Sequence, residues 1–171
     1  MNLEIMCMKR EGEQMGKVNR GKQFEKKVEQ SLSRVQDCTI TRLQDPMAGF
    51  KGIKNICDYI VYKHPCITYL ECKCCYGNRL PFSNITETQW EGLLSKSEVY
   101  GVRAGIMCWF IDHDLTFFIP IKVLDDMKVF ENKHSIHYEE CCNNEEITLI
   151  PSVKKRVLCD YAMKDFLDVC L

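Results

Sequence analysis

The stretch Asp58–Lys73, with the sequence DYIVYKHPCITYLECK, predicts a β-hairpin. Residues 56–62 and 67–72 are rich in β-branched and aromatic side chains, which favour strands. Only the four residues Lys63-His64-Pro65-Cys66 separate these two runs, and so short a connection is typical of antiparallel neighbours.

The hairpin brings two carboxylates together. With residues 63–66 as the loop, Tyr62 pairs with Ile67, and Asp58 falls directly opposite Glu71. Directly opposed residues lie on the same face of a sheet, with Cβ atoms about 4.5–5.5 Å apart. Two carboxylates at that separation repel each other, so the pair needs a compensating cation. Because oxygen ligands suit Mg²⁺ or Mn²⁺, the register predicts a divalent metal site.

A lysine follows on the same face. Lys73 lies two residues beyond Glu71, and residues two apart on a strand point to the same side. Its ammonium group is suited to orient or deprotonate a water, or to stabilise charge on a phosphate in the transition state. The three residues together suit hydrolysis of a phosphodiester. The alternative is a solvated strand face, because a Glu-x-Lys pattern is also common there.

The rest of the chain predicts a mixed sheet flanked by helices, which is an α/β fold. A flexible segment over residues 1–18 precedes one domain over residues 19–171, because the chain has no internal repeat and no linker-like composition. Hydrophobic spacing and caps predict helices from Asn19 to Val35, from Thr86 to Tyr100, near 123–127 and over 152–171. Alternating patterns predict strands over 39–43, 102–111 and 115–119. The segments 44–55 and 131–148 are expected to be loops.

Composition places limits on the function. The 171 residues carry a net charge of −1, contain no run long enough for a membrane helix and show no secretory signal, which predicts a cytoplasmic protein with reduced cysteines. Residues 1–54 nevertheless hold 11 Lys and Arg against 7 Asp and Glu. Arg20, Lys22 and Lys26 on the first helix are therefore candidate phosphate contacts, with an ordinary solvated helix face as the alternative.

The 12 cysteines allow more than one interpretation. Cys72 and Cys74 are only two residues apart, which is tighter than the pairs of a usual zinc site. Strand alternation turns both of them away from the Glu71 face, where they would pack as small hydrophobes. Zinc binding and a redox role, with Cys57, Cys66 and Cys75 as further participants, remain the alternatives. The remaining candidate ligands are expected in turns and surface loops: His64, Asp112-His113-Asp114, His134 and His137.

At this point the residues resemble a known family. Asp58, Glu71 and Lys73, with a helix upstream, are similar to the D…(D/E)-x-K pattern of the PD-(D/E)xK nuclease superfamily. Residues 19–25, NRGKQFE, resemble the opening of RecU-type Holliday-junction resolvases. The resemblance extends to about residue 165 through Leu80-Pro81-Phe82, Gln89, residues 101–110 and residues 117–120.

The resemblance implies a restriction-endonuclease-like fold and a homodimeric, metal-dependent endonuclease that makes paired nicks in four-way DNA junctions. Asp58 and Glu71 would hold Mg²⁺ or Mn²⁺, together with the main-chain carbonyl of Cys72. The resemblance also implies that Lys73 serves the attacking water, that Glu25 lies near the site, and that Gln89 supports the Lys73 side or the DNA backbone.

Two departures from the family pattern keep other functions open. Cys57 precedes the first Asp, where the superfamily often has Pro or a Thr-like residue. Only residues 44–55 stand where RecU-type proteins carry a long insertion, although Lys51 and Lys54 are candidate DNA contacts there. One alternative is a less selective or flap-directed DNA nuclease of the same fold. The other is a non-catalytic zinc- or DNA-binding accessory protein.

Overall fold

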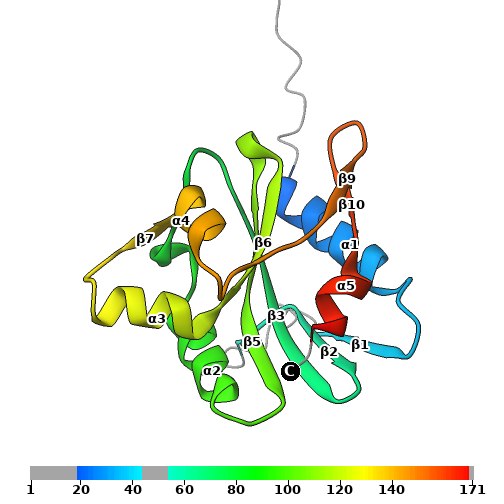
Figure 1. Ribbon diagram of the computed structural model, residues 1–171, viewed down its shortest axis with the longest axis horizontal. Coiled ribbons are helices and arrows are strands. Elements are labelled where there is room, and N and C mark those ends of the chain that lie inside the picture. The colour runs from blue at the N-terminus through cyan, green and yellow to red at the C-terminus, as the bar shows by residue number, and fades with distance from the viewer. Residues whose placement is uncertain (1–18, 44–53, 170–171) are drawn as a thin grey trace, which may run out of the picture.

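A six-stranded sheet forms the centre of the protein (Figure 1). The computed structural model describes residues 19–43 and 54–169. In spatial order the strands are β1 (Cys38–Arg42), β2 (Tyr59–Lys63), β3 (Cys66–Cys75), β5 (Val102–Phe110), β6 (Leu115–Pro120) and β8 (Thr148–Leu149). The sheet is mixed, because β3 and β5 are parallel while the other neighbours are antiparallel.

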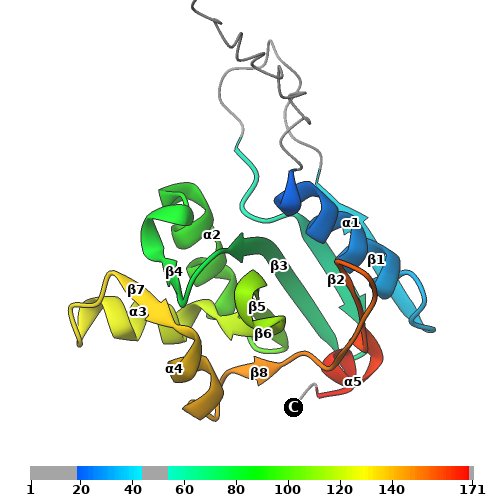
Figure 2. The same cartoon turned by 90° about the horizontal axis from the view of Figure 1, so that it is seen from above.

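Helices and two short ribbons cover the sheet. The helices are α1 (Arg20–Leu32), α2 (Glu87–Ser97), α3 (Ile121–Val129), α4 (Tyr138–Asn143) and α5 (Met163–Asp168), with 3₁₀ turns η1 (Phe82–Asn84) and η2 (Ile111–His113). The ribbons pair β4 (Arg79–Pro81) with β7 (Ser135–His137), and β9 (Ser152–Lys154) with β10 (Cys159–Tyr161). Figures 1 and 2 show α1 and α5 on one face of the sheet and α2 and α3 on the other.

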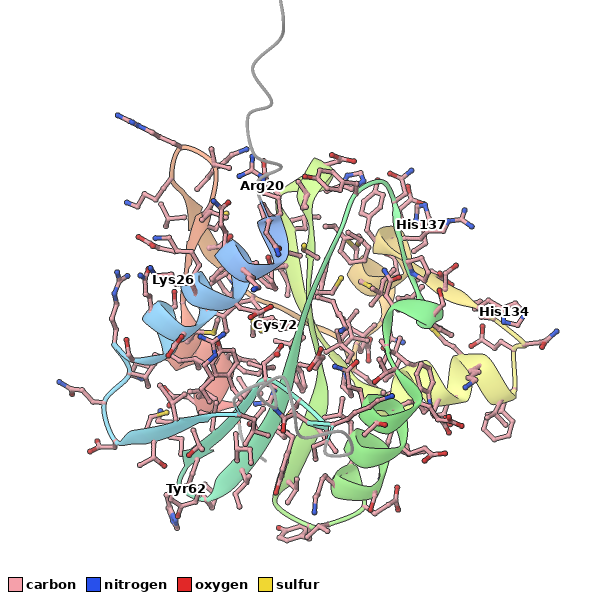
Figure 3. The ribbon with its side chains drawn as sticks, turned by 180° about the vertical axis from the view of Figure 1, so that it is seen from behind. Arg20, Lys26, Tyr62, Cys72, His134 and His137 are labelled. Carbon is pink, nitrogen blue, oxygen red and sulfur yellow. The ribbon has the colours of Figure 1, made fainter. Side chains whose placement is uncertain are left out.

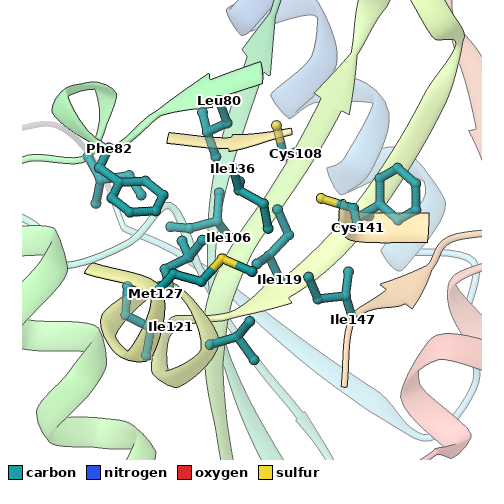
Figure 4. Packing of buried hydrophobic residues seen from close by; sticks show 14 of the residues in the cluster. Leu80, Phe82, Ile106, Cys108, Ile119, Ile121, Met127, Ile136, Cys141 and Ile147 are labelled. Carbon is teal, nitrogen blue, oxygen red and sulfur yellow. The ribbon is translucent and has the colours of Figure 1, made fainter. Parts of the chain in front are cut away.

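The alternation of β5 produces a hydrophobic core on each face of the sheet. Ile106 and Cys108 belong to the core beneath α2 and α3, and Figure 4 shows both residues packed in it. Met107 and Trp109, the intervening residues, belong to the core beneath α1 and α5. This strand is therefore buried on both sides, between the two helical layers.

The structure confirms the predicted fold class, a mixed sheet flanked by helices. It also confirms both N-caps, because Asn19 accepts a hydrogen bond from the Lys22 amide and Thr86 accepts one from the Gln89 amide. The residues on either side of the central hairpin pair in the predicted register, with Tyr62 opposite Ile67.

Two predicted segments are wrong. Residues 152–171 were expected to form one helix, but the chain forms β9, β10 and then only the short helix α5. Residues 131–148 were expected to be a loop, but they contain β7, α4 and the start of β8. In the first case β9 and β10 pair with each other as a local hairpin, which overrides the helical spacing. In the second case a polar composition hides the short elements.

Several boundaries also differ from those expected. The first helix ends at Leu32 rather than near Val35, and β2 begins at Tyr59 rather than at residue 56. Lys63 and Cys66 pair with each other, so the central hairpin has a two-residue turn instead of a four-residue loop. This tightening leaves the register unchanged. Within residues 19–43 and 54–169, none of the helices has the length and apolar character needed to span a bilayer.

Candidate active site

The central hairpin places the first carboxylate at the edge of β3. The Asp58 amide donates to the Leu70 carbonyl at 3.1 Å, although Leu70 is the register partner of Tyr59, so the regular pairing is displaced by one residue just before β2. The β2–β3 pairing begins with Tyr59 opposite Leu70, and the position of Asp58 directly opposite Glu71 stays a prediction. The Asp58 carboxylate Oδ2 accepts a hydrogen bond of 2.8 Å from the Cys72 amide, so the Asp58 side chain is tied to β3 just before β2 begins.

The second carboxylate is almost completely buried. Glu71 is only 3% exposed, and its Oε1 accepts two hydrogen bonds of 2.6 Å, one from Lys73 Nζ and one from Gln89 Nε2. Its other oxygen, Oε2, is buried and has no hydrogen-bond partner among the described residues. A buried carboxylate oxygen without a partner is costly, and it therefore calls for an explanation.

The charge of this carboxylate is disfavoured by its surroundings. Burial, followed by the neighbouring Asp58 carboxylate, raises the pKa of Glu71 to about 7, against the lowering effect of Lys73. Glu25 makes the smallest of the raising contributions to that pKa. A positive charge placed at the free Oε2 would offset both the burial and the repulsion from Asp58.

The start of α2 fixes the contact from Gln89 to Glu71. Thr86 and Gln89 form a reciprocal capping box, in which Gln89 Oε1 accepts from the Thr86 amide at 3.0 Å. The opposite end of the same side chain, Nε2, donates to Glu71. Because the cap determines which way the amide points, Gln89 presents an N–H group to Glu71 and thereby orients it.

A glycine lets α2 approach the chain that leads to Asp58. A Cβ built on Gly92 would lie 2.3 Å from Ile56 Cγ2 and 2.7 Å from Ile56 Cβ. Such distances are not tolerated, so only glycine allows this contact. The helix that carries Gln89 and the segment before Asp58 are consequently packed directly against each other.

On the other face of the sheet, α1 contributes an acidic residue. Phe24 and Val28 bury α1 against the sheet, and the Tyr59 hydroxyl donates to the Glu25 main-chain oxygen at 3.1 Å. The Glu25 carboxylate lies 3.4 Å from Arg42 Nη2 at the end of β1. Glu25 is therefore held by β1 and β2, close enough to influence the pKa of Glu71 electrostatically.

The donor set fits a divalent cation held by few protein ligands. Among the described residues, no group of three or more His, Cys, Asp and Glu side chains is arranged to bind a metal ion. The site instead offers Asp58, Glu71 with its unpartnered Oε2, and the predicted carbonyl of Cys72. Mg²⁺ is commonly held by one or two carboxylates, with waters and substrate phosphates completing its shell.

The cysteines of this region pack in the two cores. Cys57 and Cys75 are buried in the core beneath α2, and Cys72 is buried in the core beneath α1. Cys74 is partly buried and packs against the second of these cores. The interpretation of these cysteines as core-packing residues is confirmed.

The predicted DNA contacts lie on and near α1. Lys22, Lys26 and Lys54 are exposed, while Arg20 is half-buried with its Nη1 3.0 Å from Gln23 Oε1. Figure 3 shows Arg20 and Lys26 on α1, beside the strand that carries Cys72. Lys51 and the predicted flexible segment lie outside the described residues.

Sequence reasoning missed two contributors to the site. Arg42 pairs with both Glu25 and Glu29, each at 3.4 Å, and no local spacing connects α1 with β1. Gly92 was not singled out, although a glycine inside a helix costs about 1 kcal/mol relative to alanine and so indicates a close approach.

Comparisons with known proteins add a structural similarity. No family model matches the chain, and no curated protein matches it. Among solved structures it is similar to Hjc, a Holliday junction resolvase from the archaeal hyperthermophile Archaeoglobus fulgidus, with a TM-score of 0.44 and 17% sequence identity over 60% of this chain and 78% of that one.

Proposed function

We propose that this protein is a metal-dependent DNA endonuclease. One observation carries the proposal: the carboxylate of Glu71 is buried next to Asp58, with one oxygen held by Lys73 and Gln89 and the other without a partner. A structural ion pair would satisfy both oxygens. A site that binds a cation leaves one carboxylate oxygen available for it.

Each residue then has a distinct part in phosphodiester hydrolysis. A divalent cation held by Asp58, Glu71 and the Cys72 carbonyl would supply Lewis-acid polarisation of the scissile phosphate. Lys73, only 2.6 Å from Glu71, orients the attacking water or stabilises the negative charge that develops on the phosphate oxygens. Gln89 positions Glu71 for this arrangement, so it is a positioning residue.

Cleavage of labelled DNA tests the proposal. With Mg²⁺ or Mn²⁺ the wild-type protein should cut DNA, and Asp58→Asn and Glu71→Gln should each reduce the rate by about 100-fold or more, as is typical when a charge-stabilising group is lost. Asp126→Asn, which removes an exposed carboxylate on α3, is the matched control and should retain the wild-type rate. Equal activity in Asp58→Asn would overturn the proposal.

We further propose that the preferred substrate is a four-way DNA junction and that the active form is a homodimer. The resemblance of residues 19–25 and of the Asp58, Glu71 and Lys73 pattern to RecU-type resolvases supports this specificity. Two symmetric nicks are simplest to make with two sites related by a two-fold axis.

Competition between a junction and a linear duplex of the same sequence tests the specificity. Paired symmetric cuts, with the duplex competing poorly, are the expected result; equal cleavage of both would indicate a less selective nuclease. Light scattering should give a mass near twice the 20.0 kDa of one chain. A monomer that still makes paired cuts would contradict the dimer.

A further inference from the structure

The β9–β10 hairpin presents a run of positive charge. Lys154, Lys155 and Arg156 are consecutive and exposed, and the turn is closed by a 2.8 Å hydrogen bond from the Lys155 amide to the Leu158 carbonyl. Val153, on the same ribbon, is 64% exposed, so this end of the hairpin contributes little to the core. The ribbon therefore projects its cations into solvent.

This hairpin is fixed against α1. The Tyr161 amide donates to Ser31 Oγ at 3.2 Å, and Lys27 Nζ lies 3.1 Å from Asp160. Tyr161 is also buried in the core beneath α1. Figure 1 shows the ribbon beside α1, with its tip extending past the sheet. The position of the cations is thus set by the fold.

The cations around this ribbon outnumber the carboxylates that neutralise them. Asp160 is shared by Lys27 at 3.1 Å, Arg34 at 3.9 Å and Lys155 at 4.0 Å. Lys154 pairs with Asp114, while Arg156 has no acidic partner among the described residues. We call the five cations the hairpin cluster: Lys27, Arg34, Lys154, Lys155 and Arg156.

The hairpin cluster continues the basic side of α1. Figure 3 shows the ribbon next to α1, which carries Arg20 and Lys26, and to the side of the strand that carries Cys72. The whole chain has a net charge of −1, so this concentration of positive charge is local. A local basic surface next to a predicted nuclease site has an anionic polymer as its natural partner.

We propose that the hairpin cluster binds the phosphate backbone of a double-stranded DNA arm, at a distance from the cleaved bond. The proposal rests on the proposed nuclease function for the identity of the polymer. Long, exposed Lys and Arg side chains contact phosphates irrespective of sequence, which suits an enzyme that must hold a duplex arm of any sequence. A two-stranded ribbon is also narrow enough to follow a groove of the duplex.

The salt dependence of binding tests the proposal. The double variant Lys155→Gln, Arg156→Gln is compared with wild type for a fluorescein-labelled duplex in EDTA, by anisotropy over a series of KCl concentrations. Each lost phosphate contact should reduce the slope of log K against log salt by about 0.9, so we expect a reduction of about 1–2 and an affinity roughly tenfold lower. The matched control is Lys122→Gln, Lys128→Gln on α3, which removes two charges from the opposite face and should bind like wild type.

The outcomes separate this proposal from the function on which it rests. If wild type cleaves DNA but the hairpin variant keeps the wild-type salt slope, the hairpin proposal is overturned and the nuclease stands. If wild type binds DNA with the expected difference between variants but cleaves no DNA with Mg²⁺ or Mn²⁺, the nuclease proposal is overturned and phosphate binding by the hairpin cluster stands. Binding to phosphatidylserine vesicles that is lost in the hairpin variant, with unchanged binding to DNA, would also overturn the proposal.

Discussion

At the scale of the residue, Glu71 shows a conflict between stability and function. Its carboxylate is buried, faces the like charge of Asp58 and leaves Oε2 without a hydrogen bond among the described residues. Lys73 compensates only part of this cost, because the pKa of Glu71 remains raised to about 7. Active sites commonly retain such unfavourable groups because the chemistry requires them.

Glu71→Gln should therefore abolish metal binding without destabilising the fold. The amide removes the repulsion from Asp58, and Lys73, which is 20% exposed, can be hydrated once its partner is neutral. We expect a free energy of unfolding in EDTA within about 1 kcal/mol of wild type or above it, compared with the 3–5 kcal/mol lost when a fully buried ion pair is broken. Urea unfolding and Mn²⁺ calorimetry measure the two effects. A large loss of stability would instead identify Glu71 as part of a structural ion pair.

Gln89→Glu separates capping from positioning. The substitution keeps an oxygen for the Thr86 amide, so α2 should stay capped and folded, but it replaces the N–H group donated to Glu71 by a negative charge. Because the new carboxylate repels the buried Glu71, we expect stability to fall at neutral pH and to recover in acid, with cleavage reduced at least tenfold and a higher Mn²⁺ requirement. Thr86→Ala is the control: it should cost about 1 kcal/mol of stability with a smaller effect on cleavage. If Gln89→Glu cleaved DNA at the wild-type rate while Thr86→Ala lost cleavage, Gln89 would be only a capping residue.

Residue spacing predicts part of this site and not the rest. Asp58, Glu71 and Lys73 could be placed together because a short hairpin leaves few registers, and its pairing determines which side chains meet. The direction of Gln89 could not be predicted: the family resemblance implies support of the Lys73 side or of the DNA backbone, and in the structure its amide contacts Glu71. Arg42 was missed because its partners on α1 are distant in sequence, and only the folded chain brings them together.

At the scale of the element, the C-terminal region shows where local patterns fail. The apolar residues of this region are buried as expected: Tyr161, Phe166 and Leu167. They belong, however, to a ribbon and a short helix rather than to one long helix. A contact to Ser31 on α1 and a turn at Lys155 decide this outcome. Neither leaves a periodic signal in the sequence.

Gly92 provides a prediction about how α2 is seated. Gly92→Ala should destabilise the protein by about 1–3 kcal/mol, because its Cβ would overlap Ile56, and this overpacking exceeds the gain of about 1 kcal/mol in helix propensity. Cleavage should also fall, since Ile56 leads directly to Asp58.

Gly21→Ala on α1 is the matched control for this substitution. Among the described residues its Cβ would meet only Asn19 Oδ1, at 3.4 Å, so the propensity gain should appear as equal or higher stability. Thermal unfolding of the two variants gives the comparison. If Gly92→Ala were as stable as Gly21→Ala, the close approach of α2 to Ile56 would not be needed.

At the scale of the whole molecule, two buried cores enclose ionisable groups that are neutral at physiological pH. Cys141 is 2% exposed in the core beneath α2 and α3, and burial raises the pKa of its thiol to about 12. Tyr161 is buried in the core beneath α1, where burial raises the pKa of its phenol well above the usual 10. Both cores therefore resist ionisation, and both depend on their groups staying protonated.

The protein should consequently lose stability in alkali from about pH 9 upward. The Cys141 thiol has a folded-state pKa of about 12 against 9.0 when unfolded, so above pH 9 the unfolded chain releases the proton first and is favoured. Its contribution is complete below pH 9 and is lost as the pH rises toward 12, at a cost of about 1 kcal/mol by pH 10. Urea midpoints from pH 7 to 11 measure the effect. Other buried groups, such as Cys57 and Tyr161, are raised in the same direction, so Cys141→Ala should make the decline shallower by its own share of about 1 kcal/mol at pH 10. Cys142→Ala, at the exposed neighbour, should leave the decline unchanged, and a decline identical in all three proteins would place the alkaline sensitivity elsewhere.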